Sequence, residues 1–191
     1  MHISRINNIN FKADIIKSVS ILRKTGDEGY KPYMAKLAEF DINNPKDIDK
    51  LTEICHMPEF TFYGYELPVS MREGNNESVT KHCFALLKNT QDPASEIDKR
   101  NVLGLFTFNE FKDDKQPDRI PLFITNQHYR TRWYRDTREN EFMHIGHGMA
   151  QALQEIFPIK SIKCFAEPGA IEFWKKNGFQ QIDDRWVMLI R

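Results

Sequence analysis

The chain has 191 residues, of which 40% are hydrophobic and 28% are charged. This balance is close to the average of globular proteins, so it excludes wholesale disorder, and the length suits one full domain better than two. Lys and Arg together number 27, as do Asp and Glu, so the net charge is zero. A zero net charge argues against a protein that binds nucleic acid or a membrane surface through a general basic surplus.

The cysteine pattern and the apolar runs indicate a cytoplasmic protein. The chain contains three cysteines, far apart in the sequence and odd in number, which favours reduced thiols over a disulfide scaffold. The apolar runs fall far short of the roughly 20 residues that cross a bilayer. Lysines at positions 12 and 17 interrupt the only candidate secretory signal.

Residues 1–30 differ from the rest and are expected to form an N-terminal extension. Phe11, Ile15, Val19 and Leu22 recur at helical spacing, and Gly26 supplies a stop signal. This pattern predicts either a packed helix or an arm that docks elsewhere. Residues 31–191 are expected to form the main domain.

The first half of the main domain predicts strands and one helix. A strand over Tyr33–Phe40 is followed by Asn44 and Pro45, which suit the N-cap and the first position of a helix. Three further runs, rich in β-branched and aromatic residues, predict an antiparallel meander. They are Val79–Leu87, Val102–Phe108 and Ile120–Tyr129.

The second half alternates helices and strands. Helices are expected over Gly146–Phe157 and Pro168–Asn177, the second ended by Gly178. Strands are expected over Ile162–Ala166 and Trp186–Ile190. The whole order predicts a mixed α/β sheet with helices on its faces.

Two glycines, Gly146 and Gly148, open the first of these helices after a strand. Such a start lets backbone N–H groups converge on an anion such as a pyrophosphate, although a plain glycine turn explains the pattern equally simply. The motifs of P-loop proteins, dinucleotide-binding folds and serine hydrolases are absent from the sequence. His144 and His147 have no neighbouring carboxylate or cysteine to complete a metal site, so no metal is expected.

The second helix carries a further pattern in Ala170, Phe173, Lys176, Gly178 and Phe179. With the two glycines, in this order and spacing, the chain resembles the GCN5-related N-acetyltransferase (GNAT) superfamily. The resemblance implies an α/β fold with a mixed, mostly antiparallel sheet, splayed central strands and flanking helices. It is strongest over residues 102–191.

The resemblance also implies acetyl-CoA as the acyl donor. The strand before the glycines would bind the pantetheine arm, and the glycine loop would cradle the pyrophosphate through its backbone. The implied cofactor-binding residues are Phe123, Ile124, Thr125, Met143, His144, Ile145, Gly146, His147, Gly148, Met149 and Trp174. The arginines at 130, 132, 135 and 138 could reach the phosphates, or could belong to a solvated loop.

Two positions depart from the family pattern. Met143 replaces a polar residue of the loop, and Trp174 replaces a tyrosine that often serves as general acid. An indole N–H does not act as an acid near neutral pH. Protonation of the departing CoA thiolate would therefore need another donor or solvent.

Acyl transfer to an amine also requires a base, because an alkyl ammonium must first lose a proton. Glu110 and His128 are the candidates, with a structural role as the alternative for each. The resulting hypothesis is direct transfer of an acetyl group from acetyl-CoA to a small-molecule or protein amine in a ternary complex. The alternative is a GNAT-fold module that binds CoA or a protein without catalysis. The sequence leaves oligomerisation open.

Overall fold

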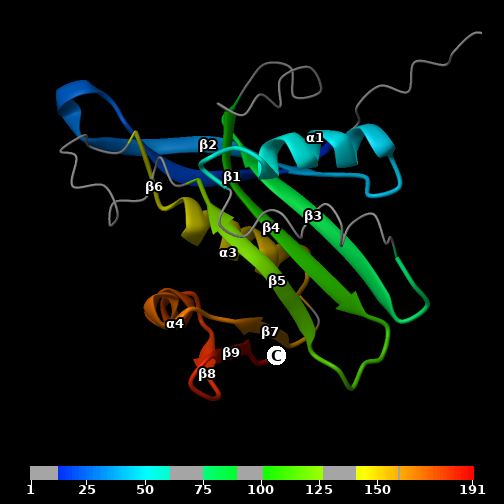
Figure 1. Cartoon of the computed structure of the whole chain (residues 1–191). Coiled ribbons are helices and arrows are strands. Elements are labelled where there is room, and N and C mark those ends of the chain that lie inside the picture. Colours follow the sequence, from blue (N-terminus) through cyan, green and yellow to red (C-terminus); the bar gives the residue numbers. More distant parts are fainter. Residues whose placement is uncertain (1–12, 61–74, 90–100, 127–140, 159) are drawn as a thin grey trace, which may run out of the picture.

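The computed structural model describes residues 13–60, 75–89, 101–126, 141–158 and 160–191. In these residues one sheet has the strand order β6-β1-β2-β3-β4-β5-β7-β9-β8 (Figure 1). Its strands are β1 Asp14–Lys24, β2 Tyr30–Glu39, β3 Val79–Leu87, β4 Val102–Phe111, β5 Asp118–Thr125, β6 Phe142–Met143, β7 Ile162–Phe165, β8 Gln180–Gln181 and β9 Trp186–Leu189. The helices are α1 Pro45–Cys55, α3 Ile145–Ile156 and α4 Ile171–Lys176, with 3₁₀ turns at Gly26–Glu28 and Pro168–Ala170.

Residues 14–24 form strand β1, so the helical interpretation of this stretch is wrong. β1 pairs along its length with β2, and a bulge lies between Ile15 and Lys17. Ile15 packs against the core on the α1 side, whereas Val19 lies in the core on the α3 side. The bulge shifts the alternation of side chains by one residue, so Ile15 and Val19 face opposite cores although they are four residues apart.

The predicted meander is confirmed, because β3, β4 and β5 pair antiparallel in sequence order. The start of α1 is also as expected. The Asn44 side chain accepts a hydrogen bond from the Lys46 backbone N–H (3.1 Å), and Pro45 opens the helix. Gly178 has φ +89°, the left-handed conformation that favours glycine after a helix.

The helices cover opposite faces of the sheet and enclose two cores. On one face, α3 contributes Met149 and Leu153, and α4 contributes Trp174, to a cluster with strand residues such as Phe106 and Phe108. On the other face, α1 packs its apolar residues Ile48, Leu51 and Ile54 against β3 and β4. Each helix therefore buries the apolar stripe that its sequence pattern predicts.

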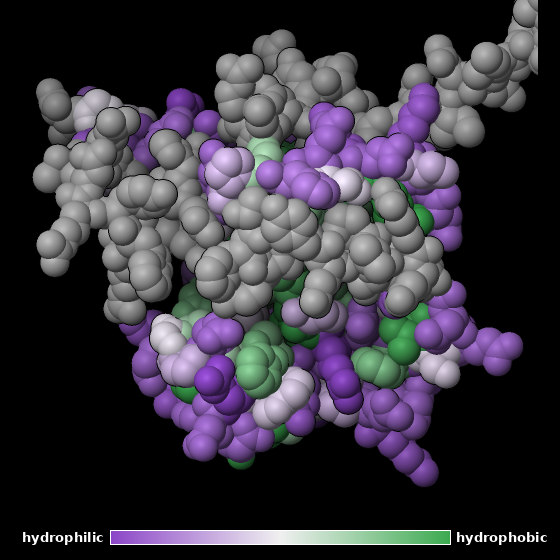
Figure 2. All heavy atoms as spheres, in the orientation of Figure 1, coloured by the Kyte–Doolittle hydropathy of each residue, from purple (hydrophilic) through white to green (hydrophobic). Residues whose placement is uncertain are grey.

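The parallel pair β5–β7 is short, and it positions the candidate site. The strands pair only where Asp118–Ile120 meets Ile162–Cys164. Beyond that point they diverge toward their C-terminal ends (Figure 1). This splay is the separation that the sequence analysis expected between the central strands. Around β5 and β7, Figure 2 shows hydrophobic residues reaching the surface among hydrophilic ones.

Candidate active site

A β-bulge in β5 determines which backbone groups face the splay. Thr107 lies opposite Leu122 and Asn109 opposite Arg119, so three residue steps on β5 oppose two on β4. The extra residue falls at Ile120–Pro121, and proline suits a bulge because it has no N–H to donate to a neighbouring strand. One extra residue reverses the edge of β5 toward which each later N–H points.

Beyond the bulge, Phe123 and Thr125 direct their backbone groups toward the splay. The Asn126 N–H donates to the Leu103 carbonyl in β4 (2.9 Å). Because backbone groups alternate along a strand, the Ile124 N–H also points to β4, while those of Phe123 and Thr125 point to the opposite edge. The prediction that the Ile124 backbone serves the cofactor is therefore wrong, and its side chain is buried on the α1 side at 2% exposure.

The start of α3 has backbone donors at an uncapped end. His144 precedes the helix with φ 62° and ψ 19°, and no side chain of the described residues caps the helix. The N–H groups of Ile145, Gly146 and His147 belong to the first turn, whose donors have no acceptor within the helix. The helix dipole adds partial positive charge there. This end of α3 suits an anion.

Two expected members of the pyrophosphate loop lie elsewhere. The Gly148 N–H donates to the His144 carbonyl (2.9 Å), so it is part of the helix ladder. Met143 lies in β6 opposite Leu22 of β1, and the adjacent pairing of the Lys24 N–H with the Glu141 carbonyl (2.8 Å) directs the Met143 N–H to β1 as well. The predictions for the Gly148 and Met143 donors are therefore wrong. The strand β6 has two residues, too few to show the side-chain alternation from which a strand can be predicted.

Gly146 joins the start of α3 to the end of the splay. A Cβ atom at this position would lie 3.1 Å from the Phe173 Cε2 atom of α4 and 3.6 Å from the Thr125 Cγ2 atom of β5. The start of α3, the end of β5 and α4 therefore meet at this glycine. An extended ligand lying along the open edge of β5 would reach the uncapped helix end directly.

His147 holds the start of α3 to α4. The Asn177 Nδ2 group donates to the Phe173 carbonyl (2.8 Å), which turns its Oδ1 atom toward His147 Nδ1 at 2.6 Å. The His147 Nδ1 atom must then be the donor. His144 is exposed, with its ring centroid 6.3 Å from that of His147. Both histidines thus lie at the helix end where the sequence analysis expected them.

Besides Ile124, three of the predicted cofactor residues have side chains in the core. Ile145, Met149 and Trp174 are 4%, 0% and 3% exposed. The Trp174 ring contacts those of Phe123 and Phe179, each with centroids 4.8 Å away. At the position where the family often has an acidic hydroxyl, this chain therefore has an aromatic core residue. The packing of Trp174 against Phe123 and Phe179 accounts for a tryptophan here without a contact to the cofactor.

Glu110 lies on β4, on the α3 side of the sheet, with its side chain 46% exposed. Phe106 faces Phe123 across the strand pair. Glu110 is four residues farther along β4, so at the usual rise of a strand it lies about 13 Å from Phe106. Its nearest charged neighbour is His82 of β3, whose Nε2 atom lies 3.6 Å from Glu110 Oε2. His128, the other predicted base, lies outside the described residues, as do the four arginines.

Asp118, at the start of β5, is a buried carboxylic acid in the same region. Its Oδ1 atom accepts a hydrogen bond from the Phe111 backbone N–H (2.9 Å). Burial raises the pKa of Asp118 above its ordinary value, and the nearby Glu110 carboxylate adds to the rise. Hydrogen bonding from Phe111 and the charge of Lys160 oppose it. Sequence reasoning missed this residue because a single Asp at a strand start carries no signal of burial.

Within the described ranges, no helix has the length and apolarity to cross a membrane. The same part of the chain holds no group of three or more His, Cys, Asp or Glu side chains arranged to hold a metal ion.

No protein-family model matches the chain, and no curated protein matches it in sequence. Solved structures do match its fold. An aminoglycoside 6'-acetyltransferase type Ii superposes with a TM-score of 0.50 at 15% identity, over 80% of this chain and 94% of that protein. Escherichia coli ElaA gives a TM-score of 0.50 at 14% identity, over 81% of this chain and 97% of ElaA. A tandem GNAT protein from the clavulanic acid biosynthesis pathway gives 0.51 at 11% identity, over 78% of this chain and 45% of that protein.

Proposed function

Because the chain has the fold of the GNAT acetyltransferases, we propose that it transfers an acetyl group from acetyl-CoA to an amine, directly within a ternary complex. One observation carries the proposal: beyond the bulge, the Phe123 backbone faces the splay, and the splay ends at the uncapped start of α3. An edge that presents backbone groups can bind an extended amide-containing arm as if it were another strand. The helix start can bind the phosphates at its far end.

The described residues fit acetyl-CoA in a consistent order. The N–H groups of Ile145, Gly146 and His147 would hold the pyrophosphate, and the Phe123 backbone would hold the pantetheine amides. Gly146 suits this place because a larger side chain would project between Phe173 and Thr125. A structure of an aminoglycoside 6'-N-acetyltransferase in complex with coenzyme A has the same fold as this chain, with a TM-score of 0.50 at 14% identity, over 80% of this chain and 94% of that protein. Acetyl-CoA supplies an activated thioester, so the protein need only orient it and deprotonate the acceptor.

Glu110 is the base that the described residues support. An alkyl ammonium with a pKa near 10 must lose a proton before it attacks the thioester carbonyl. Glu110 has an exposed carboxylate about 7 Å along β4 from the point that faces the bulge and about 13 Å from the residue that faces Phe123. The N–H of Phe123 would polarise the carbonyl. The CoA thiolate, with a pKa near 8.5, leaves without a dedicated acid, so the burial of Trp174 is compatible with turnover.

A second candidate function is CoA binding without catalysis. The observation that favours it is Trp174, which is 3% exposed and offers no acid. A turnover assay separates the two functions. Acetyl-CoA would be incubated with polyamines, amino acids, aminoglycosides and peptides, and acetylated products detected by mass spectrometry. A product above the background without enzyme supports catalysis, whereas binding without any product favours the second function.

Isothermal titration with CoA and acetyl-CoA tests the proposed site. Gly146→Asp would place a carboxylate beside the phosphates and is expected to weaken binding at least about tenfold, a change of about 1.4 kcal/mol. Gln151→Glu makes the same charge change on an exposed position of the same helix and serves as the control. We expect it to alter the Kd less than about twofold. Absence of saturable binding to either ligand at about 1 mM, a binding free energy weaker than about −4 kcal/mol, would overturn the proposal.

A further inference from the structure

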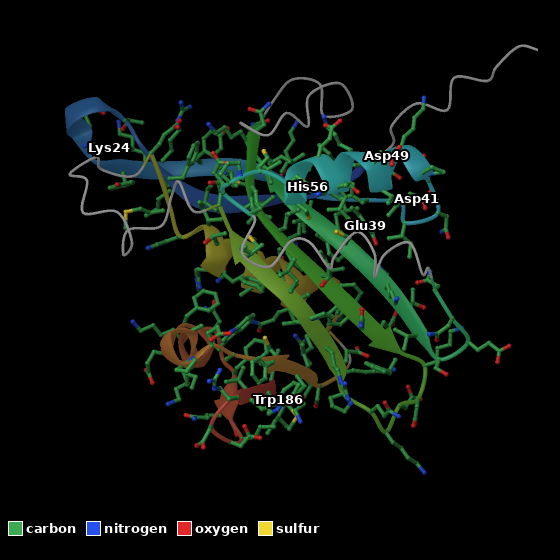
Figure 3. The ribbon with its side chains drawn as sticks, viewed as in Figure 1. Lys24, Glu39, Asp41, Asp49, His56 and Trp186 are labelled. Carbon is green, nitrogen blue, oxygen red and sulfur yellow. The ribbon has the colours of Figure 1, made fainter. Side chains whose placement is uncertain are left out.

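Three titratable side chains lie in a row across adjacent strands on the α3 side of the sheet. They are Glu39 of β2, His82 of β3 and Glu110 of β4. The His82 Nδ1 atom is 2.7 Å from Glu39 Oε1, and its Nε2 atom is 3.6 Å from Glu110 Oε2. Figure 3 labels Glu39 beside β3. This row could not be predicted from the sequence, because Glu39 and His82 are 43 residues apart and meet only through strand register.

The His82 ring is held in place by aromatic packing. It stacks on Phe84 with an interplanar angle of 9°, and Phe157 contacts it edge-on with centroids 5.1 Å apart. Its Nδ1 atom faces the Glu39 carboxylate, which can only accept a hydrogen bond when ionised, so Nδ1 carries a proton. The ring therefore has a fixed orientation, and the proton of the neutral ring lies on Nδ1.

The Nε2 atom of His82 is the unusual one. It is buried, and among the described residues it has no hydrogen-bond partner. A buried polar atom without a partner is costly. Glu110 is the nearest acceptor, and a small rotation of its exposed side chain would shorten 3.6 Å to the roughly 2.8 Å of a hydrogen bond. A proton placed between these two atoms would satisfy both.

We propose that Glu110, His82 and Glu39 form a proton relay, an inference that rests on the proposed function. Glu110 takes the proton from the acceptor ammonium, breaking an N–H bond and forming an O–H bond. His82 Nε2 then takes that proton from Glu110, giving an imidazolium between two carboxylates. Glu39 acts as a positioning residue that holds the ring and stabilises its charge. The single proton returns through the exposed Glu110 carboxylate to water.

Further charged groups lie around the row. Asp14 of β1 lies opposite Glu39, and the buried Asp118 of β5 lies close enough to interact with Glu110 and His82. Two lysines lie on this side: Lys160 pairs with Asp114 at 3.3 Å and also donates to the Phe111 carbonyl, and Lys17 of β1 pairs with Glu155 of α3. From the residue that ends α3, Phe157 contacts His82 with its ring. Glu39 and Glu110 thus place a carboxylate beside each nitrogen of the His82 ring.

Two measurements on the full chain test the relay. The first is the pH profile of kcat for the best amine found in the turnover screen. We expect Glu110→Gln to lower kcat about 100-fold or more and His82→Gln about 10-fold, with the KM for acetyl-CoA within about twofold. The deficit should narrow as the pH approaches about 10, where the amine is already neutral. His56→Gln is the matched control, because His56 lies at the exposed end of α1 (Figure 3).

The second measurement does not depend on activity. Side-chain ¹⁵N NMR of His82 at pH 7 should show a smaller protonated fraction at Nε2 in Glu110→Gln and in Glu39→Gln than in the unmodified protein. An unchanged protonated fraction, or a kcat in His82→Gln equal to that of His56→Gln, would overturn the relay. If acetyl-CoA does not bind at all, the proposed function fails and the relay falls with it. If acetyl-CoA binds and kcat in His82→Gln equals that in His56→Gln, only the relay fails.

Discussion

Gly148 is required where α3 crosses β1, and replacing it by alanine tests that contact. A Cβ atom at this position would lie 2.8 Å from Val19 Cγ1, 3.0 Å from Ile21 Cγ2 and 3.2 Å from the Ser20 carbonyl oxygen. Valine and isoleucine have few rotamers in a packed strand, and the carbonyl belongs to the backbone. None of the three atoms can move away without displacing β1 or the helix.

The expected loss of stability follows from two opposing effects. Overpacking of this kind costs about 1–3 kcal/mol. Alanine is favoured over glycine inside a helix by about 0.5–1 kcal/mol, which offsets part of that cost. The free energy of unfolding should therefore fall by about 1–2 kcal/mol. For a chain of this size, each kcal/mol corresponds to about 2–4 °C, so the Tm should fall by about 2–8 °C.

Gly146→Ala is the matched control, because it makes the same change one half-turn earlier in the same helix. Its Cβ would lie 3.1 Å from the half-buried Phe173 ring and 3.6 Å from a Thr125 methyl group, and the ring can move outward. We expect a Tm within about 2 °C of the unmodified protein. Differential scanning calorimetry and denaturant unfolding of both variants provide the measurement. A Gly148→Ala protein at least as stable as the unmodified one would refute the close approach of α3 to β1.

Three further predictions concern stability and thiol chemistry. Asn44→Ala should reduce the free energy of unfolding by about 1–2 kcal/mol, measured by urea denaturation, because it removes the cap of α1 and a hydrogen bond to a buried carboxylate; an unchanged midpoint would contradict this. Burial raises the pKa of Asp118, so the folded state binds its proton more tightly than the unfolded state, and stability falls as the pH rises from the unfolded pKa through the folded pKa. Asp118→Asn should therefore stabilise the protein at pH 7, and the gain should disappear as the pH falls toward about 4, where the unfolded carboxyl is also protonated; thermal melts across this range check the sign. Burial also raises the pKa of Cys55 and Cys164 to about 12 and that of Cys83 well above its ordinary value, so all three thiols should react slowly with Ellman's reagent until denaturant is added, and a fast-reacting thiol in the folded protein would show this to be wrong.

The sequence predicted correctly those elements whose bounds depend on interactions between residues close together in the chain. β3 has the expected bounds because its β-branched and aromatic run is uninterrupted, and α1 begins where Asn44 and Pro45 place it. Gly178 ends the helix of α4 in the conformation that glycine favours. In each case the relevant interaction spans only a few residues, so no knowledge of the rest of the chain is needed.

What the sequence could not predict depends on partners far along the chain. A four-residue spacing fits a strand as well as a helix, so the apolar pattern of β1 could not decide between them, and the pairing of β6 with β1 is visible only in the folded sheet. The alternation that assigns Ile124 to β4 depends on the bulge at Pro121, whose position is defined by the opposite strand. His82 likewise acquires its neighbours through the register of three strands.

The extra residue in β5 shifts the alternation of side chains and backbone groups by one residue between the two halves of the strand. Before the extra residue, Asp118–Ile120 pair with β7. After it, the backbone groups of Ile124 point to β4 and those of Phe123 point to the splay. Deleting one residue there would remove the shift, and the side chains of Phe123 and Ile124 would exchange faces, placing each in the wrong core. Point substitutions cannot compensate for such a change, because every later residue is displaced together. We therefore expect β5 to tolerate changes of residue type far better than changes of length.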